Sequence, residues 1–175
     1  MDENWASSAI DSTISGLRPK DLFVTREVPT NNLKNPFSYT NHTVYDSTRG
    51  VSKILFPDGT DVEASSPSVV TAFDSDGFSL TADALGNDNS DTYVAWQWKA
   101  NGGTTSSNSD GDVTSTVQAN TTAGFSIVTF TGNGASQTVG HGLNQAPVLS
   151  IRKKRETTGD WFVHTNIFDG GMDYL

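Results

Sequence analysis

Turn-forming sequences interrupt this chain so often that no stretch is left for a long helix. The tripeptides Pro57-Asp58-Gly59, Ser75-Asp76-Gly77 and Thr158-Gly159-Asp160 are examples: glycine accepts a positive φ, and Asp and Ser side chains bond the nearby backbone. Between the turns lie short runs rich in β-branched and aromatic residues, which favour strands. We expect strands at 21–27, 42–45, 53–56, 69–73, 78–80, 92–99, 125–131, 147–153 and 161–165.

Many short strands joined by tight turns are typical of two sheets packed face to face. The sequence therefore predicts an all-β fold, an antiparallel β-sandwich of the jelly-roll type. No run approaches the roughly 20 apolar residues that span a bilayer, and the start of the chain is acidic where a signal peptide is basic. We expect neither a signal peptide nor a transmembrane segment.

Charge and cysteine content exclude further classes of function. The chain has 11 basic and 20 acidic residues, a formal net charge of −9, so nucleic acid and anionic membrane surfaces are repelled overall. It contains no cysteine, which excludes disulfides, zinc–thiolate sites and thiol catalysis. We expect no nucleic-acid partner and no membrane insertion.

One long segment is almost free of apolar residues. Residues 101–123 are rich in Gly, Ser, Thr and Asn, and Val113, Val117 and Ala119 are nearly their only apolar side chains. This composition predicts a linker or a long surface loop. A ligand-binding loop is the alternative interpretation.

The chain also resembles itself. Gly16-Leu17 matches Gly142-Leu143, and His42-Thr43 matches His164-Thr165, a spacing of about 125 residues. The repeat divides the chain into an N-terminal tail (1–15), a first unit forming the sandwich (16–100), the linker (101–123) and a partial second unit (124–175). We expect the strand at 125–131 to complete the first unit's sandwich. Alternatively, the chain is a fragment of a longer repeat array, and its unpaired edges then favour association.

Four segments carry a family resemblance: residues 73–80 (FDSDGFSL), 91–103 (DTYVAWQWKANGG), 124–128 (GFSIV) and 140–147 (GHGLNQAP). They resemble a repeated β-sandwich domain of unknown function in structural proteins of marine and cyanobacterial phages, associated with tails and tail fibres. That domain is similar to concanavalin A-like lectin domains. The resemblance implies a place in the virion tail, with other virion proteins or copies of the chain itself as partners and cell-surface glycan as ligand. It supplies no catalytic residues.

Aromatic residues are the candidates for glycan binding. In the expected strand 92–99, alternation places Val94, Trp96 and Trp98 on one face, which we expect to fill the core. A stacking platform for a sugar ring is the alternative role of the two indoles. Three other aromatic residues have more polar neighbours and are the ones expected to hold a glycan: Trp161, Tyr93 and Tyr39.

Acidic turns are the candidates for a metal site. Carboxylate oxygens are the ligands that calcium takes, and the four we select as a calcium site are Asp74, Asp76, Asp88 and Asp91. Turn formation is the competing explanation of these residues. The three histidines, His42, His141 and His164, are too scattered for a metal site. No cofactor other than calcium is expected.

No nucleophile elbow, phosphate loop or dinucleotide-binding motif is present, so we expect a protein that is not an enzyme. A polysaccharide depolymerase needs only two carboxylates, and Glu27, Glu63 and Glu156 are the internal glutamates available. The basic run at 152–155 is expected to guard a strand end against aggregation. The expected function is a structural module of a phage tail or tail fibre that attaches to host-surface glycan. The alternatives are an architectural, oligomerising or capsid-associated domain without a ligand, and a depolymerase.

Overall fold

The computed structural model describes residues 22–28, 41–66, 69–83, 86–89, 91–166 and 173–174, the first and last of these ranges by their backbone alone. The described residues contain strands, turns and loops and no helix, which confirms the all-β prediction; no helix among them could span a membrane. All nine expected strands are present. The strands are β1 (Leu22–Val28), β2 (Thr43–Asp46), β3 (Lys53–Ile54), β4 (Ala64–Ser65), β5 (Val70–Asp74), β6 (Gly77–Leu80), β7 (Thr92–Trp98), β8 (Ser106–Asn108), β9 (Ser115–Asn120), β10 (Phe125–Phe130), β11 (Leu149–Lys153), β12 (Trp161–Thr165) and β13 (Asp173–Tyr174).

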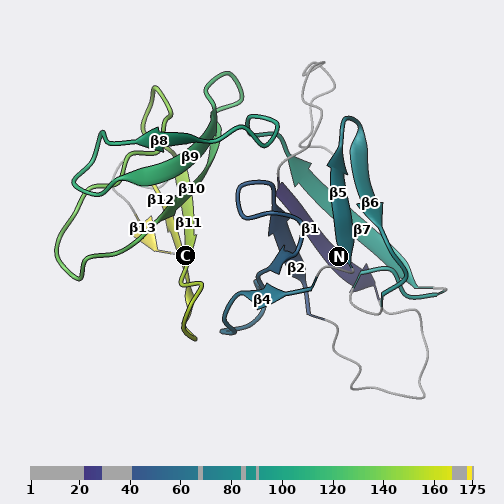
Figure 1. Cartoon of the computed structure of the whole chain (residues 1–175). Helices are drawn as coiled ribbons and strands as arrows, with labels where there is room; N and C mark the ends of the chain where they lie inside the picture. The colour runs from purple at the N-terminus through teal and green to yellow at the C-terminus, as the bar shows by residue number, and fades with distance from the viewer. Residues whose placement is uncertain are drawn as a thin grey trace, which may run out of the picture.

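The strands form small antiparallel sheets. Three of them have three strands each, in the orders β2-β1-β7, β10-β9-β8 and β11-β12-β13, and β3-β4 and β5-β6 form two-stranded ribbons. Strands β1, β2, β5, β6 and β7 lie on one side of the molecule, and β8 to β12 lie on the other (Figure 1). Several antiparallel sheets are consistent with a β-sandwich, whereas the jelly-roll order stays a prediction.

An apolar core lies where β2, β3 and β5 meet. Tyr45, Ile54, Val69 and Val70 are fully buried and form one cluster. The N–H of Val44 donates to the carbonyl of Leu55 at 2.9 Å, which ties β2 to the end of β3. Each buried side chain of this size contributes roughly 1.5–3 kcal/mol by leaving water.

The prediction of a linker or long surface loop at 101–123 is wrong, because this segment contains β8 and β9. All six residues of β9 pair with β10, with Val117 opposite Val128. Alternation of apolar residues could not reveal β9, since its buried positions are Ser115, Val117 and Gln118. The polar side chains among them are satisfied within the fold; the Ser115 hydroxyl, for example, donates to the carbonyl of Gly140 at 2.8 Å.

This pairing also corrects the expected role of the strand at 125–131. Among the described residues, β10 pairs with β9 and with no strand of the first repeat unit. The strands that the repeat aligns, β1–β2 and β11–β12, are each an antiparallel pair. Their sheets differ in the third strand, which is β7 for the first pair and β13 for the second.

Polar side chains join the two sides of the molecule. The amide oxygen of the fully buried Gln118 accepts from the backbone N–H groups of Asn101 at 3.0 Å and Gly103 at 2.8 Å. Its amide nitrogen donates to the hydroxyls of Thr48 at 2.9 Å and Ser47 at 3.1 Å. One side chain of β9 therefore fixes both the turn after β2 and the connection from β7 to β8.

A buried ion-pair network makes a second connection. Arg49 donates to the carboxylates of Asp46 and Glu63, and its own side chain is almost completely buried. The carboxylate of Glu63 also forms an ion pair with the guanidinium of Arg155 at 3.6 Å, and the backbone N–H of Glu63 donates to the carbonyl of Arg155 at 2.8 Å. The end of the β11 segment is thereby held against the loop before β4.

Candidate functional site

An exposed apolar stripe runs along one face of β7 and consists of Val94, Trp96 and Trp98. Each indole is 45% exposed, and Val94 is 37% exposed. Residues two apart on a strand point to the same face, so the two indoles are about 7 Å apart along the strand. The stripe is the largest run of neighbouring aromatic side chains that the described residues present to solvent.

The exposure of this stripe corrects the expectation that it fills the core. Alternation identifies which side chains share a face, but a face is buried only where another element packs on it. β7 lies at the edge of its sheet and pairs with β1, and the fully buried apolar cluster draws its residues from β2, β3 and the β5 region. The two tryptophans are therefore partly exposed on one face, as their alternative role would require.

Tyr93 lies on the opposite face of β7 and is half-buried. Its hydroxyl accepts the backbone N–H of Asp88 at 2.9 Å. The carboxylate of Asp88 in turn accepts the N–H of Asn89 at 2.8 Å, a bond between neighbouring residues of the loop before β7. Tyr93, predicted to hold a glycan, thus positions a polar loop at the start of the strand that carries the stripe.

The four residues selected for calcium are divided between two turns. The carboxylate of Asp74 accepts the hydroxyl of Ser79 at 2.7 Å across the β5–β6 hairpin, with Asp76 at its tip. Asp88 and Asp91 belong to the loop before β7. The described residues contain no group of three or more His, Cys, Asp or Glu side chains that could hold a metal ion. The competing explanation, turn formation, accounts for Asp74 and Asp88, because their carboxylates bond within their own turns.

Of the other two residues predicted to hold a glycan, the structure describes Trp161 and does not describe Tyr39. Trp161 is half-buried at the start of β12, and its indole N–H donates to the carbonyl of Phe56 at 2.8 Å. This bond uses the polar group of the side chain to hold β12 against the end of β3. Tyr39 lies outside the described residues.

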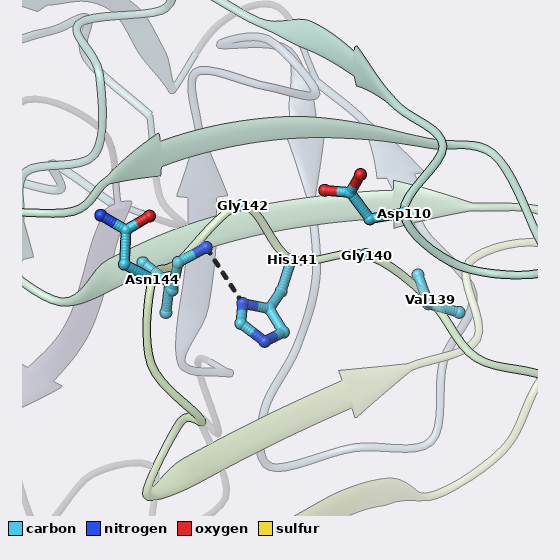
Figure 2. A pocket seen from close by; sticks show the side chains of 7 residues that line it. Asp110, Val139, Gly140, His141, Gly142 and Asn144 are labelled. Carbon is cyan, nitrogen blue, oxygen red and sulfur yellow. Dashed lines mark hydrogen bonds between the residues drawn. The ribbon is translucent and has the colours of Figure 1, made fainter.

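A pocket of about 320 Å³ surrounds the turn at Gly140–His141–Gly142 (Figure 2). Gly142 has a φ of 70°, and a Cβ at Gly140 would overlap the side chain of Asn108, so glycine is needed at both positions. The Nδ1 atom of His141 accepts the N–H of Leu143 at 3.1 Å within the turn. In Figure 2 the side chains of Asp110, His141 and Asn144 point in different directions, so the pocket offers no convergent set of polar groups.

The glutamates whose side chains the structure describes lie in different surroundings. Glu63 is bound by Arg49 at 3.0 Å and by Arg155 at 3.6 Å, which occupies its carboxylate. Glu156 is exposed in the turn between β11 and β12, and Glu27 belongs to β1, where the backbone alone is described. The separation of two carboxylates decides glycosidase chemistry. The pocket described above has no glutamate in its lining.

Comparison with known proteins gives one result. A family model described as a domain of unknown function, DUF7483, matches residues 31–174. The chain belongs to this family. Searches of curated proteins and of solved structures found no match.

The match places the whole β7 stripe and all of β2 to β13 within the DUF7483 domain. The sequence pattern assigned Trp96 and Trp98 to the core, although each is 45% exposed. It favoured Trp161, which has its indole N–H bonded internally. One signal was available in the sequence. β7 carries aromatic residues on both faces, Tyr93 on one and the two tryptophans on the other, so alternation alone did not choose the buried face.

Proposed function

We propose that this DUF7483 domain is a non-enzymatic structural module of a phage tail or tail fibre that attaches to host-surface glycan through the β7 stripe. The observation that carries the glycan proposal is the equal exposure of Trp96 and Trp98 on one face of a strand. The place in the virion rests on the sequence resemblance to structural proteins of phages.

The physical argument begins with the cost of ordering. Tryptophan presents a large, rigid, partly apolar surface at the expense of only two side-chain torsions, which makes it an efficient contact residue. Two indoles on consecutive same-face positions of a strand are fixed by the backbone, so little further entropy is lost when a ligand stacks on them. A sugar ring has apolar C–H faces and polar edges, and the stripe suits its faces.

Polar groups in the loop before β7 suit the edges of a sugar. The loop before β7 carries exposed Asn87, Asp88 and Asn89, and the amide of Asn87 donates to the carbonyl of Thr81 at 3.0 Å. The bond from the N–H of Asp88 to the Tyr93 hydroxyl ties this part of the loop to β7. Neutral and acidic hydrogen-bonding groups therefore lie at the start of the strand that carries the stripe.

A flat stripe gives weak binding by a single copy, because it buries much less of a ligand than a closed pocket does. Attachment then depends on several copies acting together, as multivalent modules gain avidity from effective concentration. A tail structure with repeated subunits supplies that multivalency. The net charge of −9 argues against nucleic acid as the ligand of the same surface.

The test is a glycan array followed by isothermal titration with the array's strongest oligosaccharide. Trp96→Ala and Trp98→Ala each remove one indole and are expected to weaken binding at least about tenfold, or about 1.4 kcal/mol. Because both side chains are well exposed, the melting temperature should stay nearly unchanged.

Phe162→Ala is the matched control, since Phe162 is also 45% exposed but lies on β12. It should bind as the wild type does. Equal losses in the control and the stripe variants would contradict a site on β7. Release of new reducing ends from the bound polysaccharide would identify a depolymerase instead.

A further inference from the structure

The outer edge of β11 has no strand partner among the described residues. The sheet order is β11-β12-β13, so β12 pairs with one edge of β11 and leaves the other open. Leu149 is 48% exposed and Ile151 is 56% exposed, and both lie on the same face of β11. Unpaired strand edges with exposed apolar side chains are templates for another strand.

The register with β12 shows which backbone groups face outward. The N–H of Asn166 donates to the carbonyl of Val148, so these two residues form a hydrogen-bonded pair. In an antiparallel ladder, hydrogen-bonded and non-hydrogen-bonded pairs alternate along the strand. Ser150 and Arg152 are therefore the residues of β11 that exchange hydrogen bonds with β12. The N–H and C=O groups of Leu149, Ile151 and Lys153 therefore point away from β12. These are the groups that a further strand would bond.

The basic run at 152–155, expected to guard this edge, is largely engaged within its own chain. Arg152 lies 5.8 Å from the centre of the Phe162 ring and bonds His164 at 3.1 Å. The ammonium group of Lys153 donates to the carbonyls of Gly159 at 2.8 Å and Thr60 at 3.2 Å. Arg155 pairs with Glu63. Three of the four charges are thus drawn away from the edge that they would protect.

We propose that the outer edge of β11 pairs antiparallel with β11 of a second copy of this chain, about a two-fold axis at Ile151. In that register Ile151 faces Ile151 of the other copy, Leu149 faces Lys153, and Ser150 faces Arg152. No cation lies directly opposite another cation, and the ammonium group of Lys153 turns away, which leaves its aliphatic stem against Leu149.

The same register places every outward backbone group opposite its complement. Leu149, Ile151 and Lys153 form hydrogen-bonded pairs across the axis, giving about six backbone bonds. A two-fold axis closes the assembly at two copies, so the two β11 strands join their sheets into one continuous sheet. The self-complementary register commits the edge to a second copy as occupant. This inference rests on the structural part of the proposed function and not on glycan binding.

Disulfide trapping tests the register directly, because the chain has no cysteine of its own. Hydrogen-bonded residues in antiparallel strands have Cα atoms about 5.5 Å apart, within the range that a disulfide spans. Ile151→Cys should therefore become mostly a covalent dimer under mild oxidation. Val148→Cys is the matched control: Val148 is 60% exposed, but its two copies would lie about 20 Å apart along the strands. The control should stay mostly monomeric.

Sedimentation over a range of concentrations tests the association itself. Wild-type chain should form a dimer, and Ile151→Lys, which places two ammonium groups at the axis, should lose it. Val62→Lys introduces the same charge at an exposed position elsewhere and should dimerise as the wild type does. A wild-type monomer at every concentration, or equal crosslinking of the two cysteine variants, overturns the proposal. Ile151→Lys should still bind glycan. A loss of dimerisation can therefore be told apart from a loss of the glycan site on β7.

Discussion

The two sides of the molecule hold together by different means. The side with β1 to β7 is centred on an apolar cluster in which Tyr45, Ile54, Val69 and Val70 are fully buried. Among the described residues, the side with β8 to β13 has Gln118 and Thr165 as two of its most buried residues, and Val117 as its buried apolar side chain. One side therefore depends on removing apolar surface from water, and the other depends more on satisfied polar groups.

The difference shows what short strands need in order to be stable. An apolar cluster tolerates changes in shape if the volume is conserved, because the hydrophobic effect has no preferred direction. A buried amide such as Gln118 stabilises the fold only while its partners are in place, since an unsatisfied buried polar group costs roughly 1–3 kcal/mol. The apolar side should therefore be sensitive to volume and the polar side to hydrogen-bond chemistry.

The largest effect is expected in the apolar cluster. Ile54→Ala removes a fully buried side chain and leaves a cavity, so the free energy of unfolding should fall by about 3 kcal/mol. Ile54→Val, which removes a single methylene group, should cost about 1 kcal/mol. Urea denaturation followed by tryptophan fluorescence measures both. Equal losses in the two variants would show that volume is not what the cluster requires.

A smaller effect is expected at Gln118. Gln118→Leu keeps the volume of the side chain but leaves the N–H groups of Asn101 and Gly103 without their acceptor. The free energy of unfolding should fall by about 2 kcal/mol, a loss that a volume argument does not predict. Gln118→Glu keeps the acceptor oxygen but loses the N–H group that donates to Thr48. The hydrogen bond from the backbone N–H of Asn101 to this side chain should therefore survive. Hydrogen exchange of the Asn101 and Gly103 amides tests this directly: both should exchange faster in Gln118→Leu than in the wild type. If these two amides exchange equally slowly in Gln118→Leu and in the wild type, Gln118 does not link the two sides.

The strands of the apolar side and the hairpins could be predicted from the sequence because each combines β-branched or aromatic residues with strong turn signals. Asp74 lies opposite Gly77 across the predicted Ser75-Asp76 turn, as the local sequence requires. β8 and β9 could not be predicted in the same way. Their residues are mostly Ser, Thr, Asn and Gln, and these become strand residues only through tertiary partners such as β10 and the Gly140 turn.

The candidate site could be predicted only as far as residue type. The sequence identifies the aromatic face of β7, but exposure depends on which other elements pack against that face, and periodicity does not contain this information. Trp161 shows the opposite error. Its polar sequence neighbours suggested an exposed side chain, whereas its indole N–H finds an acceptor at Phe56, far away in the sequence.

The smallest effect concerns a polar contact at the surface of the second side. The carboxylate of Asp112 accepts both the hydroxyl and the backbone N–H of Thr138 at 2.8 Å, and these bonds hold the pKa of Asp112 below its usual range. A lowered pKa means that the folded state favours the ionised form, so the stabilisation is present above the unfolded-state value of about 3.9 and is lost as the pH falls through the folded value. Asp112→Asn should lower the melting temperature slightly at pH 7, and the difference from the wild type should shrink as the pH falls toward 3. Asp160→Asn, at another exposed carboxylate, corrects for the loss of one negative charge. A difference that stays constant with pH would mean that Asp112 acts through its shape and not through its charge.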